Sequence, residues 1–331
     1  MKARGWAVTV LVSGSGCFSP EPRLPSSPVV IAVVDDGVDT SRNELRGRTA
    51  VNLPEIRDND VDDDGNGFID DSCGYDFLDR DARPDPVTAG DHLSHGTMMA
   101  LVALRSSDHP SQAAAPTPVQ ILPLRVGNQS GVDGAAVVAA IDYAAGWHRR
   151  TVVNLSLGTI RSVLPAPLLT AMRRQTDLLF VVAAGNQGRR ITDMRASLCR
   201  GHLENVVCVA AVDSEGRLAT YPKASNFGEF VDVAAPGVDI PVTDAVGTTV
   251  TETGTSLAAA FVSGRAARLW SATPDVSAAE IARMLCAGAR KRDTVDVRCG
   301  ILTVGGAAGT VASGPRWVVS AARLTMKLLG I

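Results

Sequence analysis

The 331-residue sequence predicts an α/β fold, a three-layer αβα domain around a mostly parallel, doubly wound central sheet. Apolar runs rich in β-branched residues lack polar alternation, which is typical of strands buried on both faces. These runs cover residues 29–35, 119–126, 151–157, 178–184, 206–212 and 231–235. Helical patterns alternate with them, at residues 95–104, 134–147, 165–175, 256–270 and 277–287. Strands that alternate with helices indicate a doubly wound sheet.

The composition excludes some classes of partner. The chain is 45% hydrophobic, so it can bury a large core and is not expected to be disordered. Its 32 basic and 35 acidic residues give a net charge of -3. This balance gives no electrostatic reason to expect nucleic acid or an anionic membrane surface as a partner.

The amino-terminal residues 1–16 are interpreted as an export signal. Two basic residues precede a short apolar run and small residues, and Cys17 follows. A membrane-spanning helix needs about 20 apolar residues, more than this run contains. The segment resembles a bacterial lipoprotein signal, in which Cys17 would be lipidated; the alternative is a cytosolic start without a lipid. We therefore expect an exported protein, either lipid-anchored in the cell envelope or secreted, with membrane contact only through Cys17.

The remaining chain is expected to form one domain. Residues 17–28 are rich in Pro and Ser and are interpreted as a tether. A single domain is expected over 29–310, with an acidic insert at 57–85, followed by a C-terminal helix at 311–331 that docks onto its own domain.

Cysteine spacing agrees with export. Cys199 with Cys208, and Cys286 with Cys299, are close enough in sequence to close short disulfide loops. If Cys17 is lipidated, this pairing leaves Cys73 unpaired. The alternative is that all of these cysteines are buried thiols.

Four short segments carry residues suited to acyl transfer. Asp35 ends the first apolar run in VVDDG, His95 begins a helical pattern in SHGTMMA, Asn186 follows a run in VVAAGNQG, and Ser256 opens a helix in GTSLAAAFVSG. Each alone has a simpler explanation, such as a turn residue, a surface His or a helix cap. Together they supply a hydroxyl nucleophile, a base, a carboxylate to hold that base, and donors for an oxyanion.

These segments resemble the subtilase family of subtilisin-like serine peptidases. IAVVDDGVD, HGTMMA, VVAAGN and GTSLAAAFVSG resemble its blocks around the Asp, His, oxyanion Asn and Ser, and the order Asp, His, Asn, Ser is that of subtilisin. TVVNLSLG and VDVAAPGVDI resemble two further blocks. The resemblance implies a subtilisin-like fold and a serine endopeptidase, a hydrolase that cleaves peptide or protein substrates.

By this resemblance, Asp35 orients His95, His95 acts as general base and acid, and Ser256 attacks the peptide carbonyl. Asn186 and the Ser256 N–H would hold the oxyanion. Asp36 is the rival for the carboxylate role, but the first Asp of the family's Asp-x-Gly pattern is the catalytic one. The strand at Ser156, Leu157 and Gly158 would pair with substrate backbone, opposite a second wall near Gly131.

The acidic insert resembles a calcium loop. Seven Asp lie between Asp58 and Asp71, and packed carboxylates repel one another unless a cation neutralises them. A register that starts at Asp60 matches the loop pattern of a calcium site. Its expected ligands are Asp60, Asp62, Asp64, Asn66 and Asp71. Calcium would be a structural ion, with no cofactor needed for catalysis; the alternative is a solvated acidic loop.

The chain departs from the family pattern at Met98, Leu101 and Ala260, where the family usually has His, Gly and Pro. No propeptide is evident between Cys17 and the first strand, so a separate inhibitor or folding partner is an expectation. Two other functions remain open. One is a non-catalytic subtilase-fold surface protein with a binding or structural role, and the other is a narrow-specificity enzyme that transfers a peptide acyl group. A nucleotide-binding protein is disfavoured because no Gly-rich fingerprint follows the first strand.

Overall fold

The structure is a computed structural model, and it describes residues 28–87, 93–108, 119–128, 130–157, 160–161, 165–192, 198–199, 203–244 and 248–303. The expected export signal, the lipidation site Cys17, the tether up to residue 27 and the C-terminal helix at 311–331 lie outside these residues. Within the described part of the chain, none of the helices combines the length and apolar character needed to cross a membrane.

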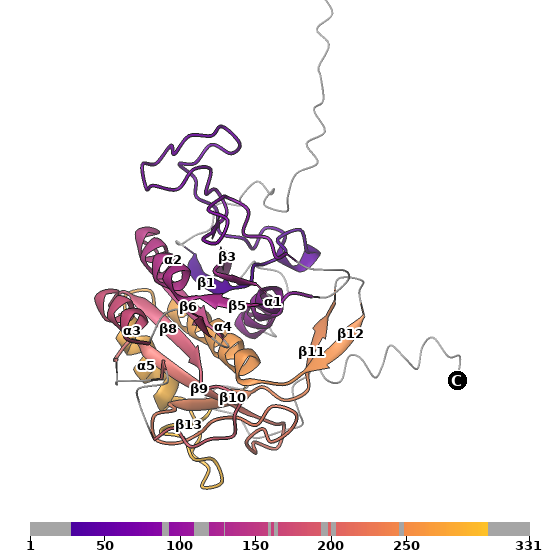
Figure 1. The fold of residues 1–331 in the computed structure, drawn as a ribbon. Coiled ribbons are helices and arrows are strands. Elements are labelled where there is room, and N and C mark those ends of the chain that lie inside the picture. Colours follow the sequence, from indigo (N-terminus) through magenta and orange to yellow (C-terminus); the bar gives the residue numbers. More distant parts are fainter. Residues whose placement is uncertain are drawn as a thin grey trace, which may run out of the picture.

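An eight-stranded sheet forms the centre of the fold (Figure 1). Its strand order is β13-β10-β9-β8-β6-β1-β3-β2, and all neighbouring pairs are parallel. The strands are β1 (Val29–Asp35), β2 (Tyr75–Asp76), β3 (Val119–Arg125), β6 (Thr151–Leu155), β8 (Leu178–Ala183), β9 (Val206–Val212), β10 (Val233–Pro236) and β13 (Gly300–Ile301). The six apolar runs therefore form parallel strands, as predicted.

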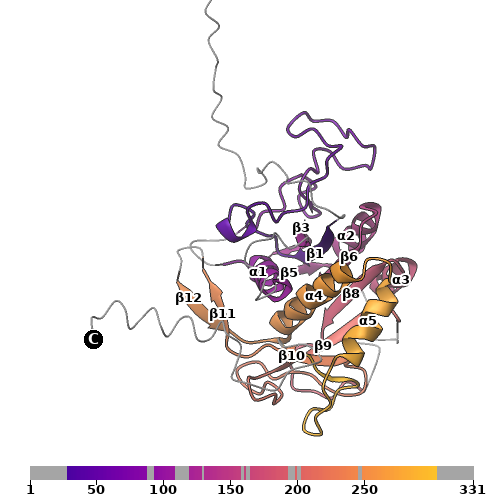
Figure 2. The ribbon, with the colours of Figure 1, turned by 180° about the vertical axis from the view of Figure 1, so that it is seen from behind.

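In the described residues, five α-helices cover the two faces of this sheet (Figures 1 and 2). They are α1 (His95–Ser107), α2 (Gly134–Gly146), α3 (Pro165–Arg174), α4 (Thr255–Ala272) and α5 (Ala278–Ala287). Alternate residues of β1 belong to different cores: Ile31 packs in the core with α1, α4 and α5, and Ala32 in the core with α2 and α3. The predicted three-layer αβα class is therefore confirmed.

Small elements surround this framework. An antiparallel hairpin joins β11 to β12, and a three-stranded sheet joins β4, β5 and β7. A short 3-10 helix, η1, follows β1. Their bounds are η1 (Asn43–Leu45), β4 (Gly127–Asn128), β5 (Gly131–Asp133), β7 (Ile160–Arg161), β11 (Ile240–Thr243) and β12 (Thr249–Glu252). None of these elements was predicted, since they are short or exposed.

Disulfides join neighbouring segments to strand β9 and to the region of β13. Cys199 is bonded to Cys208 in β9, and Cys286 in α5 is bonded to Cys299 beside β13. The expectation that Cys73 is unpaired is wrong, because Cys73 is also disulfide-bonded.

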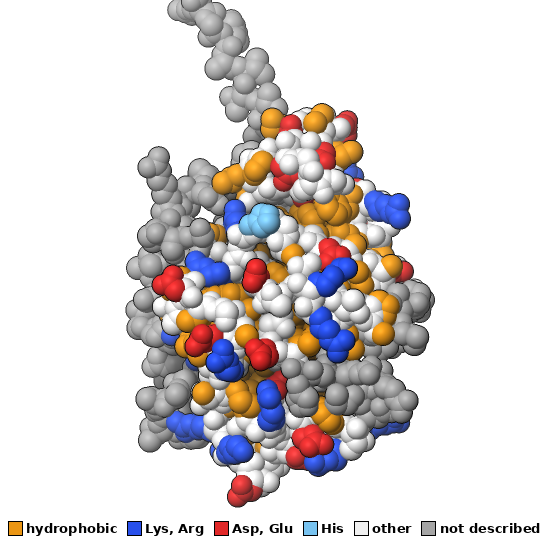
Figure 3. Space-filling model, turned by 90° about the vertical axis from the view of Figure 1, so that its left-hand side faces the viewer, with side chains coloured by type: hydrophobic (Ala, Val, Ile, Leu, Met, Phe, Trp, Pro, Cys, Tyr) orange, Lys and Arg blue, Asp and Glu red, His pale blue; other side chains and the backbone are white. Residues whose placement is uncertain are grey.

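The surface agrees with the small net charge. On the face drawn in Figure 3, acidic and basic side chains are interspersed, with hydrophobic side chains between them. No region of a single sign extends across this face.

Helices α1 and α4 approach each other closely at Gly264. A Cβ atom at this position would lie 2.0 Å from the Ala103 carbonyl oxygen and 2.0 Å from Ser106 Oγ. Ser106 Oγ also donates a hydrogen bond of 2.8 Å to the Phe261 carbonyl, so this hydroxyl is held in the contact. Only glycine lets the two helices pack at this distance.

Replacing Gly264 by Ala is expected to lower the free energy of unfolding by about 1–3 kcal/mol, because the added methyl group must separate α1 from α4. Gly146→Ala is the matched control, since a Cβ at Gly146 would meet nothing within 4 Å. This control should be neutral, or stabilising by about 0.5–1 kcal/mol, because Ala favours the helix. Chemical denaturation of both variants measures the difference; equal stabilities would contradict the packing argument.

Candidate active site

The candidate site lies at the carboxyl edge of the central sheet. Asp35 is the last residue of β1, Ser156 directly follows β6, and Asn186 lies three residues beyond β8. These three strands are neighbours in the order β8-β6-β1. In open parallel sheets, the loops at this edge are the usual place for ligands and reacting groups.

Asp35 and His95 form a hydrogen-bonded pair. His95 Nδ1 lies 2.8 Å from Asp35 Oδ1 and 3.0 Å from Asp35 Oδ2. The carboxylate side chain is 7% exposed and the imidazole 37% exposed, so a buried acid holds a ring that reaches solvent. This arrangement fixes which ring nitrogen faces the carboxylate and leaves Nε2 as the nitrogen available for proton transfer.

The Asp36 carboxylate has a different structural role from that of Asp35. Its carboxylate accepts the backbone N–H of His95 at 3.2 Å and that of Gly96 at 2.7 Å, at the start of α1. Burial, followed by the charge of Asp35, raises the pKa of Asp36. Asp36 therefore positions the helix that carries His95, whereas Asp35 contacts the imidazole itself.

Close backbone contact also fixes the start of α1. The N-cap Ser94 accepts the N–H of Thr97, which satisfies another donor of the first turn. A Cβ at Gly96 would lie 2.4 Å from the Gly37 carbonyl oxygen and 2.9 Å from Asp35 Cβ. Glycine at 96 is therefore what allows the helix to reach the end of β1.

The pKa of His95 is raised above its usual value. Burial alone would lower it, but the negative charge of Asp35 and the hydrogen bond to Asp35 outweigh burial. Asp36 adds to this effect, and the positive charge of Lys223 opposes it. The Asp35 carboxylate therefore favours the imidazolium that forms when His95 accepts a proton.

Ser256 is the second residue of α4 and is partly buried. Its Oγ donates a 3.4 Å hydrogen bond to the Ser156 carbonyl, and Ser156 Oγ donates a 3.0 Å bond back to the Ser256 carbonyl. Within the described part of the chain, no hydrogen bond links Ser256 to His95. The structure brings Ser256 to the same sheet edge as the Asp35–His95 pair without a direct contact between the hydroxyl and the imidazole.

Asn186 is oriented by the start of α4. Its Oδ1 accepts the N–H of Thr255 at 2.9 Å and the Thr255 hydroxyl at 3.0 Å. This fixes the carbonyl side of the amide, so Nδ2 remains as a donor. The Ser256 N–H belongs to the first turn of α4, whose donors have no partner inside the helix. The amide and the helix start could therefore serve one anionic oxygen together.

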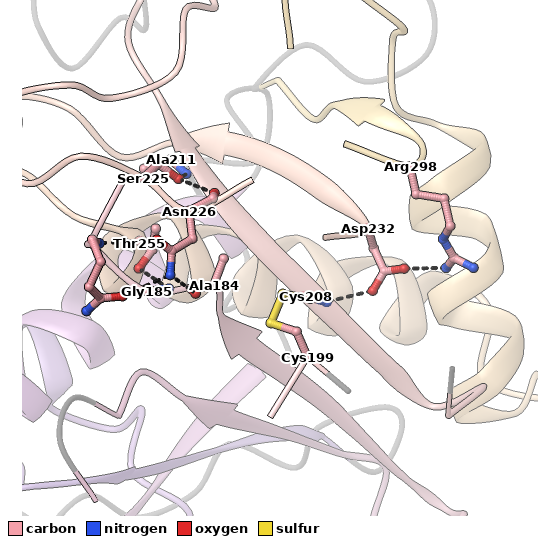
Figure 4. The surroundings of a disulfide bond; sticks show 11 residues. Ala184, Gly185, Cys199, Cys208, Ala211, Ser225, Asn226, Asp232, Thr255 and Arg298 are labelled. Atoms are coloured by element: carbon pink, nitrogen blue, oxygen red, sulfur yellow. Dashed lines mark hydrogen bonds and ion pairs between the residues drawn. A yellow bond between two sulfur atoms is a disulfide. The ribbon is translucent and has the colours of Figure 1, made fainter. Parts of the chain in front are cut away.

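Asn226 holds the loop that presents Asn186 (Figure 4). Its Nδ2 donates to the Ala184 carbonyl at 2.8 Å, and its Oδ1 accepts the N–H of Gln187 at 3.2 Å. Thr255 Oγ1 accepts the Gly185 N–H at 3.1 Å, which joins the same loop to α4. Sequence reasoning missed Asn226 because it lies far along the chain and has no motif of its own.

A buried polar chain lies beneath Ser256. Ser263 Oγ donates to Asn154 Oδ1 at 3.0 Å, and Asn154 Nδ2 donates to Ser156 Oγ at 3.0 Å. Asn154 and Ser263 are both 0% exposed. Since Ser156 Oγ in turn donates to the Ser256 carbonyl, the chain fixes α4 against β6.

The expected substrate-binding residues are described in part. Ser156 and Leu157 follow β6, and Gly131 begins β5 with a φ of 126°, a conformation that favours glycine. Gly158 lies outside the described residues.

The three departures from the family pattern are accommodated by packing. Leu101 and Ala260 are 1% and 0% exposed, and Met98 packs against the same core. Helix α4 continues without interruption through Ala260.

Loops of the acidic insert lie at the top of Figure 1, and the end of the insert returns toward the site, where the Pro84 carbonyl accepts the Val38 N–H at 3.0 Å. Carboxylate oxygens of Glu55, Asp62 and Asp64 lie within 4.8 Å of one another, a cluster that could hold a metal ion. Asp62 and Asp64 were expected here, and Glu55 was not. Asp60 is exposed and its backbone N–H donates to Asp70, so the structure does not bring it into the cluster.

Asn66 and Asp71 lie next to Asp64. Asn66 Nδ2 donates to Asp64 Oδ2 at 3.1 Å and to Asp71 Oδ2 at 2.9 Å. Asp71 is 0% exposed and also accepts the hydroxyl of Tyr143 in α2 at 2.7 Å. Burial, together with the charge of Asp71, raises the pKa of Tyr143 well above its usual value. The tyrosine therefore stays protonated as a donor.

Comparisons with known proteins agree with this geometry. The model of the subtilase family matches residues 26–301. A thermophilic serine proteinase of Bacillus sp. (strain AK1) is 34% identical over 246 residues, which cover 74% of this chain and 52% of that protein. Thermitase of Thermoactinomyces vulgaris is 30% identical over 243 residues, covering 72% of this chain and 74% of that protein.

A solved structure shares the fold. A cold-adapted subtilisin-like serine proteinase superposes with a TM-score of 0.62 at 23% identity, covering 88% of this chain and 95% of that one. The chain spans about half the length of the Bacillus proteinase and of other curated relatives that it matches. The family model covers well over half of the chain, and its blocks meet at one sheet edge in the structure. The chain is therefore a member of the subtilase family.

Proposed function

We propose that the protein is a serine endopeptidase that hydrolyses peptide bonds through Asp35, His95 and Ser256. The observation that carries the proposal is the buried Asp35 carboxylate hydrogen-bonded to His95 Nδ1, at the sheet edge where α4 begins with Ser256. Membership of the subtilase family supports the same activity.

The proposed reaction has two stages. Ser256 Oγ attacks the peptide carbonyl carbon while His95 Nε2 takes the hydroxyl proton, and Asp35 stabilises the imidazolium that forms. The negative oxygen would accept hydrogen bonds from Asn186 Nδ2 and the Ser256 N–H. His95 then gives its proton to the departing amine, which leaves an acyl enzyme. A water molecule, deprotonated by His95, attacks this ester, and the acid product and free Ser256 are released.

The proposed substrate is an extended peptide. The backbone that follows β6 at Ser156 and Leu157 lies next to Ser256, where it would pair with substrate main chain. Curated relatives include extracellular proteases, which supports export of this chain and a role outside the cytoplasm. We keep a separate inhibitor or folding partner as part of the proposal.

The reaction requires no cofactor, since a serine, a histidine and an acid carry out each proton transfer. We infer that calcium, if bound by the acidic insert, is a structural ion. The rival function is a non-catalytic surface protein. The missing hydrogen bond between His95 and Ser256, among the described residues, is the observation that favours it. In enzyme structures without substrate, catalytic hydrogen bonds are often long and tighten only when substrate binds.

Labelling with a fluorophosphonate separates these two functions. The unmodified protein is expected to form a covalent adduct, and Ser256→Ala should form none, because the nucleophilic oxygen is gone. His95→Ala should label far more slowly. Ser214→Ala is the matched control, since Ser214 is an exposed serine whose hydroxyl hydrogen-bonds Glu215 and not a proposed catalytic residue, and it should label normally. If the unmodified protein is folded by circular dichroism yet takes no label, the non-catalytic function replaces the peptidase.

Removing the Asn186 amide tests the oxyanion role. Asn186→Ala is expected to lower kcat about 10²–10³-fold with little change in KM, the range measured in subtilisin for loss of one such donor. Asn186→Asp keeps an acceptor for Thr255 but removes the Nδ2 donor, so it should also lose kcat. Recovery of activity in Asn186→Asp would show that residue 186 only supports Thr255.

The pH dependence follows from the raised pKa of His95. Only the neutral imidazole accepts a proton, so kcat/KM should fall as pH drops through this pKa, with a midpoint above the usual value of about 6.5. Because the folded-state pKa is raised, the Asp35–His95 pair stabilises the fold at low pH, and this contribution is lost as pH rises through the raised value.

Asp35→Asn should move the midpoint of the kcat/KM profile to lower pH, because the carboxylate charge that favours the imidazolium is lost. Asp142→Asn removes an equivalent charge from the exposed Asp142–Arg174 pair on α2 and α3 and should leave the midpoint in place. Equal midpoints for all three proteins would contradict the assignment of Asp35.

A further inference from the structure

A narrow pocket lies between α1, α4 and β11, on the side of the sheet that α5 also covers. Figure 2 shows α1 beside α4, with β11 next to α1. The apolar part of the pocket lining belongs to the core: Val102, Ile240 and Phe261. Three arginines also line the pocket, Arg105 of α1 and Arg265 and Arg268 of α4, and we call them the pocket arginines. Phe261, Arg265 and Arg268 follow one another at helical spacing, so they lie on one face of α4.

The acidic side chains near this pocket already pair with other arginines. Asp108 lines the pocket, but its carboxylate pairs with Arg48 at 3.1 Å. Glu44 raises the pKa of Arg105 by its charge, but its carboxylate pairs with Arg42 at 3.0 Å. Each of these two carboxylates therefore has an arginine partner of its own, and the pocket keeps an excess of positive charge.

The pocket arginines have few partners of their own. Arg105 donates a hydrogen bond of 2.8 Å to the Pro241 carbonyl. Among the described residues, Arg265 and Arg268 make neither a hydrogen bond nor an ion pair. Both side chains are half-buried, and burial lowers the pKa of each without an opposing carboxylate. A guanidinium group that loses water without gaining an anion is destabilised, so this pocket favours an occupant that carries carboxylates.

The size of the pocket restricts the kind of occupant. Its volume is about 70 Å³, whereas sites for cofactors and other small molecules usually have about 300–1,000 Å³. The pocket therefore has room for a single side chain. Its apolar lining favours an apolar side chain, and its arginines favour carboxylates on either side of it. A polypeptide segment with an apolar residue among acidic residues has this chemistry.

The acidic insert carries such a segment. Val61 is 50% exposed and lies among Asp residues. Asp58 and Asp60 are exposed, and among the described residues no donor hydrogen-bonds their carboxylates. Loops of the insert project from the body of the protein at the top of Figure 1. Asp58, Asp60 and Val61 do not line the pocket of their own chain.

We propose that the pocket of one copy of the chain binds the acidic insert of a second copy. Val61 enters the pocket, and the carboxylates of Asp58 and Asp60 accept hydrogen bonds from Arg265 and Arg268. The two surfaces are complementary in charge, and each supplies partners that the other lacks. Because the surfaces are different, the contact is head-to-tail, and a dimer keeps one free pocket and one free insert. The contact is independent of the proposed peptidase reaction.

Analytical ultracentrifugation of the full chain tests this contact. The chain carries Ser256→Ala, so self-digestion cannot occur and the result does not depend on peptidase activity. The weight-average mass should rise with protein concentration and exceed that of a dimer. Added sodium chloride should lower this mass, because salt screens the charges. A parent chain that stays monomeric at every concentration would overturn the proposal.

Two double variants test the two sides of the contact. The pocket variant is Arg265→Gln with Arg268→Gln, and the insert variant is Asp58→Asn with Asp60→Asn. Each should weaken self-association at least about tenfold, because charge-assisted hydrogen bonds are lost. Asn tolerates the φ of 57° at residue 58 and of 58° at residue 60.

Mixing the two variants tests the head-to-tail geometry. The pocket variant keeps its insert and the insert variant keeps its pocket, so an equal mixture should form a heterodimer and no larger species. A mixture that stays monomeric would contradict the contact.

Arg173→Gln with Arg283→Gln is the matched control. It removes the same charge from exposed arginines of α3 and α5 that do not line the pocket. Its self-association should equal that of the parent, and an equal loss in this control and in the pocket variant would overturn the proposal. Circular dichroism checks that each variant is folded. If the pocket variant does not fold, unchanged self-association of the insert variant overturns the proposal by itself.

Discussion

The burial of α4 against the sheet is the constraint on which the candidate site depends. Ala258, Ala259 and Ala260 are all 0% exposed, and Gly264 has no room for a methyl group beside α1. A helix of small residues can lie this close to its neighbours. Its first turn, with Ser256, is therefore held at the edge of the sheet.

Polar contacts turn this packing into a defined geometry. Apolar packing alone would allow α4 to shift along the sheet. The hydrogen bond between Ser263 and Asn154 prevents this shift, because breaking it would leave buried polar groups without partners. A buried polar contact also fixes Asp35, on the other side of the site. Its buried carboxylate accepts the Asp36 N–H and pairs with His95 Nδ1, so the acid and the imidazole fix each other. The positions of the reacting groups are therefore determined by packing and hydrogen bonds in the core.

Features that depend on local sequence were predictable, and those that depend on distant contacts were not. The continuous apolar run at Val29–Asp35 predicts a strand that is buried on both faces. The candidate site residues lie where such strands and helices begin or end: Asp35, His95, Asn186 and Ser256. No sequence pattern predicted the role of Glu55, because its burial depends on the fold of the whole insert. Asn226 supports Asn186 across 40 positions of sequence. The β11–β12 hairpin pairs exposed residues such as Val250, without an apolar run to mark it.

The most direct measurement is a crystal structure of the protein after reaction with a fluorophosphonate. The account predicts phosphorus bonded to Ser256 Oγ, with one phosphoryl oxygen accepting hydrogen bonds from Asn186 Nδ2 and the Ser256 N–H, and His95 Nε2 turned toward the adduct. The Asp35–His95 bond should persist. An unmodified Ser256, or an adduct whose oxygen points away from Asn186, would contradict the placement of the nucleophile by α4.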